Sequence, residues 1–95
     1  MKLDFRINGH YMGEEFSLSR GETRMIWFDF SADSPVDRVT LVKNERDYMI
    51  FRNCGCRLFF DYRAERECDC YYIRGITADG RWCWSSPIWI HSAED

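Results

Sequence analysis

Two runs of β-favouring residues near the end of the chain flank an Asp-Gly dipeptide, and no other feature constrains the fold as strongly. The first run covers residues 71–78 and begins Tyr71-Tyr72-Ile73-Arg74, and the second covers residues 82–91. Asp79-Gly80 lies between them. An Asp-Gly turn between two such runs is the strongest short-range signal for a β-hairpin. The sequence therefore predicts that the chain ends in a hairpin.

The turn also predicts which residues of the hairpin face each other. A two-residue turn at Asp79-Gly80 sets Gly75 opposite Trp84, where the missing side chain leaves room for the indole. If Ile73 points into the core, Gly75 and Trp84 do so as well. Proline cannot donate to a ladder, so we expect Ser85-Ser86-Pro87 to bend the final strand.

The rest of the chain alternates apolar and polar residues in short runs separated by turn residues, without a sustained helical period. Before the hairpin, the predicted strands lie near residues 3–7, 16–18, 22–31, 38–43, 48–51 and 57–62. Strands at this spacing predict an all-β fold. We expect an immunoglobulin/fibronectin-like antiparallel β-sandwich of seven or eight strands, as a single domain covering residues 1–95.

Composition and charge exclude several classes of protein. With 95 residues and 45% hydrophobic residues, the chain can bury one core. No apolar run approaches the roughly 18 residues of a membrane span, and no signal peptide is visible after Met1. The net charge of −3 argues against nucleic-acid binding. Many arginines lie beside acids, as in Asp37-Arg38, which predicts ion pairs on solvated faces. Thr40 and Lys43 are likewise expected in a wetter environment.

Five cysteines cannot all pair within one chain, and this odd number favours a reduced, cytoplasmic setting. Cys54-Gly55-Cys56 and Cys68-Asp69-Cys70 could together hold zinc. Their spacing is tighter than that of usual zinc pairs, and a hairpin turning near residues 63–67 would place them at opposite ends of its strands. We therefore expect free thiols and no metal or other cofactor, with Cys83 as a small apolar residue.

The sequence carries no pattern that predicts catalysis. His10 and His91 are the only histidines, and they could meet if the first and last strands are neighbours. A nucleophilic cysteine needs an oriented base, and no third orienting group is indicated, so a surface histidine pair is the better interpretation. Phosphate-binding loops and nucleophile elbows are also missing from the sequence. We expect that the chain is not an enzyme.

The four tryptophans are many for one small core. Met25 and Trp27 lie on the strand face opposite Ile26, which makes them the candidate interaction surface, and we expect weak self-association through it. In the alternative interpretation, Trp82 and Trp84 belong to the core and Trp27 packs under a loop. Exposed rings could also form an interface with a partner domain or stack on a glycan.

Several segments together resemble a known family. They are Asp37-Arg38-Val39-Thr40-Leu41-Val42-Lys43-Asn44, Tyr71-Tyr72-Ile73-Arg74, Asp79-Gly80 and Trp84-Ser85-Ser86-Pro87-Ile88-Trp89-Ile90. They look like the C-terminal region of bacterial metallohydrolases of the PHP (polymerase and histidinol phosphatase) superfamily. The resemblance covers roughly residues 3–91, is specific in the final third, and departs from the family at Gly75 and at the cysteines.

In that family a metal-binding catalytic barrel is followed by a small immunoglobulin-like β domain. The resemblance implies a non-catalytic accessory domain that packs on, or shapes access to, the catalytic domain of the same parent chain. The catalytic His and Asp clusters of the family lie in the barrel and have no position here. The alternative is an independent carbohydrate-binding or adhesion module. A small zinc-dependent enzyme is disfavoured because His-rich ligands are missing.

Overall fold

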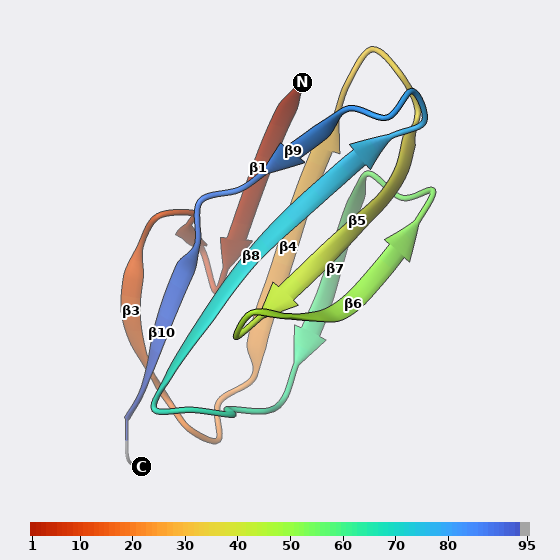
Figure 1. The fold of residues 1–95 in the computed structure, drawn as a ribbon. Helices are drawn as coiled ribbons and strands as arrows, with labels where there is room; N and C mark the ends of the chain where they lie inside the picture. The colour runs from red at the N-terminus through yellow and green to blue at the C-terminus, as the bar shows by residue number, and fades with distance from the viewer. Residues whose placement is uncertain (94–95) are drawn as a thin grey trace.

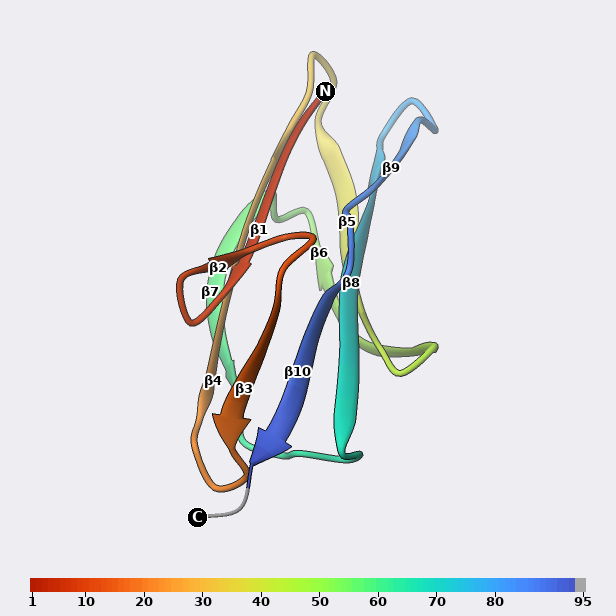
Figure 2. The ribbon, with the colours of Figure 1, turned by 90° about the vertical axis from the view of Figure 1, so that its left-hand side faces the viewer.

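The computed structural model describes residues 1–93, which form two β-sheets packed face to face (Figures 1 and 2). The four-stranded sheet has the order β2 (His10–Tyr11), β1 (Lys2–Ile7), β4 (Arg24–Ser31) and β7 (Cys56–Asp61). The six-stranded sheet contains β3 (Glu15–Ser19), β10 (Ile88–Ala93), β8 (Cys68–Thr77), β5 (Val36–Lys43) and β6 (Arg46–Arg52) in that order. Its sixth strand, β9 (Trp82–Trp84), pairs with β8.

The predicted all-β sandwich is confirmed, with two differences in detail. Ten strands are formed in the described residues instead of seven or eight, because β2 has only two residues and the final predicted strand is divided into β9 and β10. The pairs are antiparallel except for β3 with β10, which is parallel. None of the elements between residues 1 and 93 is a helix that could cross a membrane.

The core lies between the sheets and follows the predicted alternation. On β4, Ile26, Phe28 and Phe30 are buried, whereas Met25 lies on the outer face. β8 contributes every second residue from Asp69 to Thr77. Fully burying one large apolar side chain stabilises a fold by about 1.5–3 kcal/mol, so this two-sided core is the main source of stability.

The turn of the last hairpin is one residue longer than predicted. The Thr77 N–H donates to the Arg81 carbonyl at 3.0 Å, which leaves a three-residue loop. Gly80 has a φ of +88° in this loop, a conformation that glycine adopts without strain. The longer loop sets Gly75 opposite Cys83, so the predicted pairing of Gly75 with Trp84 is wrong.

The changed register moves two tryptophans out of the core. Trp84 pairs with Arg74 and shares its outward face, because a one-residue shift turns every side chain of a strand over. Trp82 and Trp84 are 41% and 60% exposed, so the prediction that they are core residues is wrong. After Ser85-Ser86-Pro87 the register slips by one residue, and Ile88 pairs with Tyr71 and is buried.

Candidate interaction surface

The outer face of the four-stranded sheet carries a patch of apolar side chains. Strand pairing places Met25 beside Phe60 and Trp27 beside Leu58. Met25 is 44% exposed and Leu58 is 52% exposed. The outer apolar patch, as we name it, consists of Tyr11, Met25, Trp27, Leu58, Phe60 and Tyr62, whose ring stacks beside that of Phe60. Contiguous exposed apolar side chains of this kind mark interaction sites on soluble proteins.

Both residues predicted for the interaction surface, Met25 and Trp27, lie in this patch, but they differ in exposure. Trp27 is half-buried, and the guanidinium of Arg6 lies 5.9 Å from its ring centroid. Arg6 is held there by Asp4, which accepts its hydrogen bonds at 3.1 and 3.2 Å. The apolar character of the patch is therefore strongest on β4 and β7, away from Arg6.

The outer face of the six-stranded sheet is different in character. The rings of Trp82 and Trp84 lie 6.1 Å apart with an angle of 18° between their planes. The Arg38 guanidinium lies 5.6 Å from the Trp82 ring centroid, and Arg74 donates to Asp47 at 2.7 Å. This face combines two near-parallel indoles with several charged groups.

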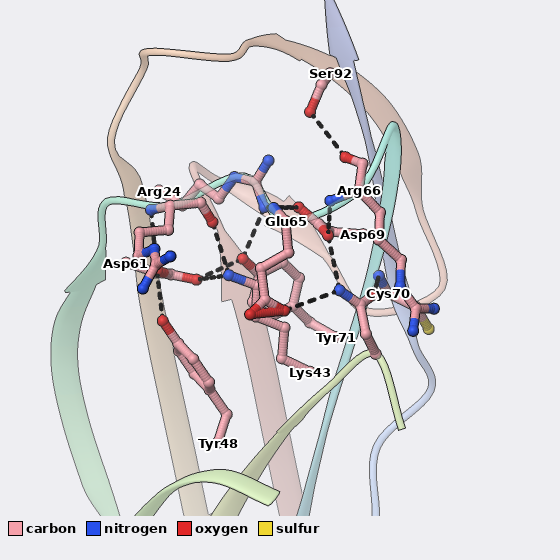
Figure 3. A network of polar contacts seen from close by, with 12 residues as sticks. Arg24, Lys43, Tyr48, Asp61, Glu65, Arg66, Asp69, Cys70, Tyr71 and Ser92 are labelled. Carbon is pink, nitrogen blue, oxygen red and sulfur yellow. Dashed lines mark hydrogen bonds and ion pairs between the residues drawn. The ribbon is translucent and has the colours of Figure 1, made fainter. Parts of the chain in front are cut away.

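One end of the sandwich contains a buried polar network that the sequence analysis missed (Figure 3). Asp61 accepts hydrogen bonds from Lys43 Nζ at 2.7 Å and from the Tyr71 hydroxyl at 2.6 Å. Lys43 is fully buried and Thr40 is buried as well, so the prediction that these two residues mark a wetter environment is wrong. Lys43 is buried because Asp61 pairs its charge and the Arg63 carbonyl accepts a second hydrogen bond at 2.7 Å.

A second carboxylate anchors the loop that leads into β8. Asp69 accepts hydrogen bonds from Arg24 at 2.6 Å, from Asn44 at 2.8 Å and from the backbone N–H groups of Glu65 and Arg66. Arg24 also donates to the Tyr71 hydroxyl at 2.7 Å, which joins the two halves of the network. The network therefore fastens residues 63–67 to both sheets.

Burial and hydrogen bonding act in opposite directions on the two carboxylates. Burial alone would raise the pKa of Asp61, but the hydrogen bonds from Lys43 and Tyr71 outweigh it and hold the pKa below its ordinary value. The pKa of Asp69 is lowered in the same way, by Asn44 and Arg24 against burial. Both groups are thus charged at neutral pH. Their partners are internal, and no pocket is found in the described part of the chain, so the network acts as structure.

A cysteine, a histidine and a carboxylate meet at the edge formed by β3, β10 and β8. His91 Nε2 lies 4.0 Å from Cys68 Sγ, and the Glu15 carboxylate contacts the same ring nitrogen. In a catalytic triad the orienting carboxylate holds the other nitrogen of the ring. Burial, with Glu15 adding to it, raises the pKa of the Cys68 thiol, which disfavours the thiolate. This geometry does not activate a nucleophile. His10 does not belong to this group, and its ring stacks on the Phe16 ring with 3.8 Å between the two centroids.

The two cysteine pairs lie at opposite ends of the sandwich (Figure 1). Cys56 begins β7 in the four-stranded sheet and Cys68 begins β8 in the six-stranded sheet, so the predicted hairpin between them does not form. Each of the five cysteines is a free thiol. Residues 1–93 contain no group of three or more His, Cys, Asp or Glu side chains arranged to hold a metal ion.

Comparison with known proteins supports the fold. No protein-family model and no curated protein sequence matches this chain. Among solved structures, the fibronectin(III)-like modules of Clostridium thermocellum CbhA align with a TM-score of 0.64 at 16% sequence identity, covering 90% of this chain and 93% of the module chain. The architecture is therefore a fibronectin(III)-like β-sandwich.

Proposed function

We propose that this chain is a non-catalytic accessory domain that docks onto a partner domain through the outer apolar patch. The observation that carries the proposal is the continuous exposure of Met25, Leu58 and Phe60 on paired strands. The face is a sheet surface without a pocket in the described residues, which suits a protein surface better than a small molecule. Its apolar centre on β4 and β7 is bordered by charge, as the core of an interface is by its polar rim: Arg6 lies between the Tyr11 and Trp27 rings, and Asp29 follows Trp27 on the same face of β4.

The partner that we propose is the catalytic domain of the same parent chain, a PHP-type metal-dependent hydrolase of the cytoplasm. The support is the resemblance in residues 37–44, 71–74 and 84–90, together with a sandwich fold of the kind that the resemblance implies. The role of this domain would be to pack on the catalytic domain or to shape access to it. The free thiols agree with a reducing compartment.

The test is to read the gene beyond this segment and to express the adjoining domain separately. Calorimetry should then detect binding between the two domains. The double variant Met25→Ser/Leu58→Ser should weaken it at least about tenfold, because interface anchors carry most of the binding energy. Ile50→Ser is the matched control, because Ile50 is 48% exposed on the other sheet. Equal weakening by Ile50→Ser, or a gene without an adjoining domain, would contradict the proposal.

A second candidate function, an independent carbohydrate-binding module, is favoured by the paired rings of Trp82 and Trp84. Pyranose rings stack on such indoles, and Arg38 and Arg74 nearby could donate to sugar hydroxyls. A soluble β-glucan should then quench tryptophan fluorescence, and Trp84→Ala should remove that quench while leaving the fold intact. Unchanged fluorescence with β-glucan and with other soluble polysaccharides would exclude this function.

A further inference from the structure

Strand β7 is an open edge of the four-stranded sheet. It pairs with β4 on one side, and no strand among the described residues pairs with its other side (Figure 1). An edge strand presents unpaired backbone N–H and C=O groups, which can pair with another chain. Which residues present these groups follows from the hydrogen-bond pattern of the sheet.

Two backbone hydrogen bonds establish that pattern. The Phe30 N–H donates to the Gly55 carbonyl at 2.6 Å, in the same register that pairs Phe28 with Arg57. On the other side of β4, the Asn8 N–H donates to the Met25 carbonyl at 2.9 Å. Hydrogen-bonded pairs alternate along an antiparallel ladder, so even-numbered residues of β4 bond to β7 and odd-numbered ones to β1.

The same alternation applies to β7. Its residues Arg57, Phe59 and Asp61 bond to β4, because they pair with even-numbered residues. The backbone groups of Leu58 and Phe60 therefore point toward the open edge. These two residues also present their side chains on the outer apolar patch.

The other edges carry features that discourage pairing. β6 has charged residues at both ends, and its ladder with β5 contains a register shift between Leu41 and Val42. β3, the other edge of the six-stranded sheet, has five residues and begins with the charged Glu15. β9 has three residues and is followed by Pro87, and β2 has two residues. β7 has no proline, glycine or bulge, and Leu58-Phe59-Phe60 is a strongly β-favouring run. Of these edges it is the one best suited to accept another strand.

We propose that β7 pairs with β7 of a second copy of this chain, antiparallel and centred on Phe59, to form a two-fold symmetric dimer. This register sets Leu58 opposite Phe60 of the second copy, so that apolar residues face each other across the seam. It sets Arg57 opposite Asp61 of the second copy, so that no like charges meet across the seam, while the Asp61 carboxylate stays paired with Lys43 in the core. Trp27 and Leu58 of one copy then lie in line with Phe60 and Met25 of the second copy, so that four apolar side chains form one row across the seam.

A second copy fits because β7 is complementary to itself in this register. The dimer forms through the strand edge and leaves the outer patch exposed, continuous over both copies. The inference therefore goes beyond the proposed docking function and does not depend on it.

Sedimentation of the isolated chain over a range of concentrations tests the dimer. Leu58→Pro removes an outward-pointing donor without removing a bond to β4. Leu58→Ala is the matched control, since it shortens the side chain and keeps the donor. We expect a monomer–dimer equilibrium for the native chain, and a dissociation constant at least about tenfold higher for Leu58→Pro than for Leu58→Ala.

Hydrogen exchange provides a readout that does not depend on a proline variant folding. The Leu58 and Phe60 amides of the native chain should become protected as concentration rises, whereas Phe59 is protected at all concentrations. A chain that stays monomeric up to about 1 mM would overturn the proposal. Dimerisation lost in Met25→Ser but kept in Leu58→Pro would also overturn it, because it would assign the contact to the face of the sheet.

Discussion

The ring of Phe30 on β4 occupies the space that a side chain at Gly75 on β8 would need. A Cβ atom at position 75 would lie 2.6 Å from two carbons of this ring. Gly75 is buried and belongs to the opposite sheet, so the contact sets how closely the two sheets approach. Glycine is required here for packing between the sheets and not for the hairpin.

Replacing Gly75 should therefore destabilise the fold. We expect Gly75→Val to lower the free energy of unfolding by about 1–3 kcal/mol, the usual cost of overpacking a core. Chemical denaturation measures this change. Phe30→Leu should offset part of it in the double variant, whereas Trp84→Ala should offset none, because Trp84 lies on the outer face. A stable Gly75→Val variant would show that the sheets can separate at this point.

The ion pair of Asp61 and Lys43 should matter far more than an exposed pair of equal length. Asp61→Asn leaves the Lys43 ammonium buried without its counter-charge, and we expect a loss of about 3 kcal/mol or more. Asp47→Asn is the control, since Asp47 pairs with Arg74 at the same distance of 2.7 Å but in solvent. Its loss should stay below about 1 kcal/mol. Similar losses in the two variants would mean that the network is solvated.

Stability should fall in acid because of the same carboxylates. The pKa values of Asp61 and Asp69 are lowered in the folded state, so the unfolded chain binds protons more readily at low pH. Their contribution is present above the unfolded-state pKa of about 4 and is lost as the pH falls further through the folded-state values. Denaturant unfolding at several pH values should show this decrease. In Asp61→Asn the decrease should be smaller, and an unchanged pH profile would contradict the assignment.

The sequence predicted those parts of the fold that depend on local alternation. The assignment of side chains to the two faces of β4 was correct, because neighbouring residues such as Ile26 and Trp27 point to opposite faces of one strand. The face predicted for Trp84 was wrong. It depends on whether the turn at Asp79-Gly80 has two residues or three, and both turn lengths fit the dipeptide. One residue of loop length reverses the whole strand.

Contacts between residues far apart in the sequence were the second part of the structure that could not be predicted. Arg24 and Asp69 are 45 residues apart, and neither neighbouring sequence indicates that they meet in the core. Met25 and Trp27 were predicted as surface residues, but Leu58 and Phe60 joined them only through the pairing of β4 with β7. A strand near residues 57–62 was predicted from the sequence, whereas its position at the edge of the sheet was not.

The five thiols should differ in reactivity according to their environments. Burial raises the pKa of Cys70, and that of Cys68 is raised as well, so both should react slowly with iodoacetamide near neutral pH. Cys56 is exposed and should react first. Mass spectrometry of the native protein over time gives the order, and all five should react after denaturation without reductant. A faster reaction at Cys68 than at Cys56 would indicate that His91 activates the thiol.

The central claim, that the outer apolar patch is a docking surface, is tested most directly by carbene footprinting of this domain alone and within its parent chain. The isolated domain is labelled at a dilution where it is monomeric. We predict that labelling of Met25, Leu58 and Phe60 falls in the parent chain, while labelling of Trp82 and Trp84 stays unchanged. Equal labelling of the patch in both samples, or protection confined to Trp82 and Trp84, would contradict the account.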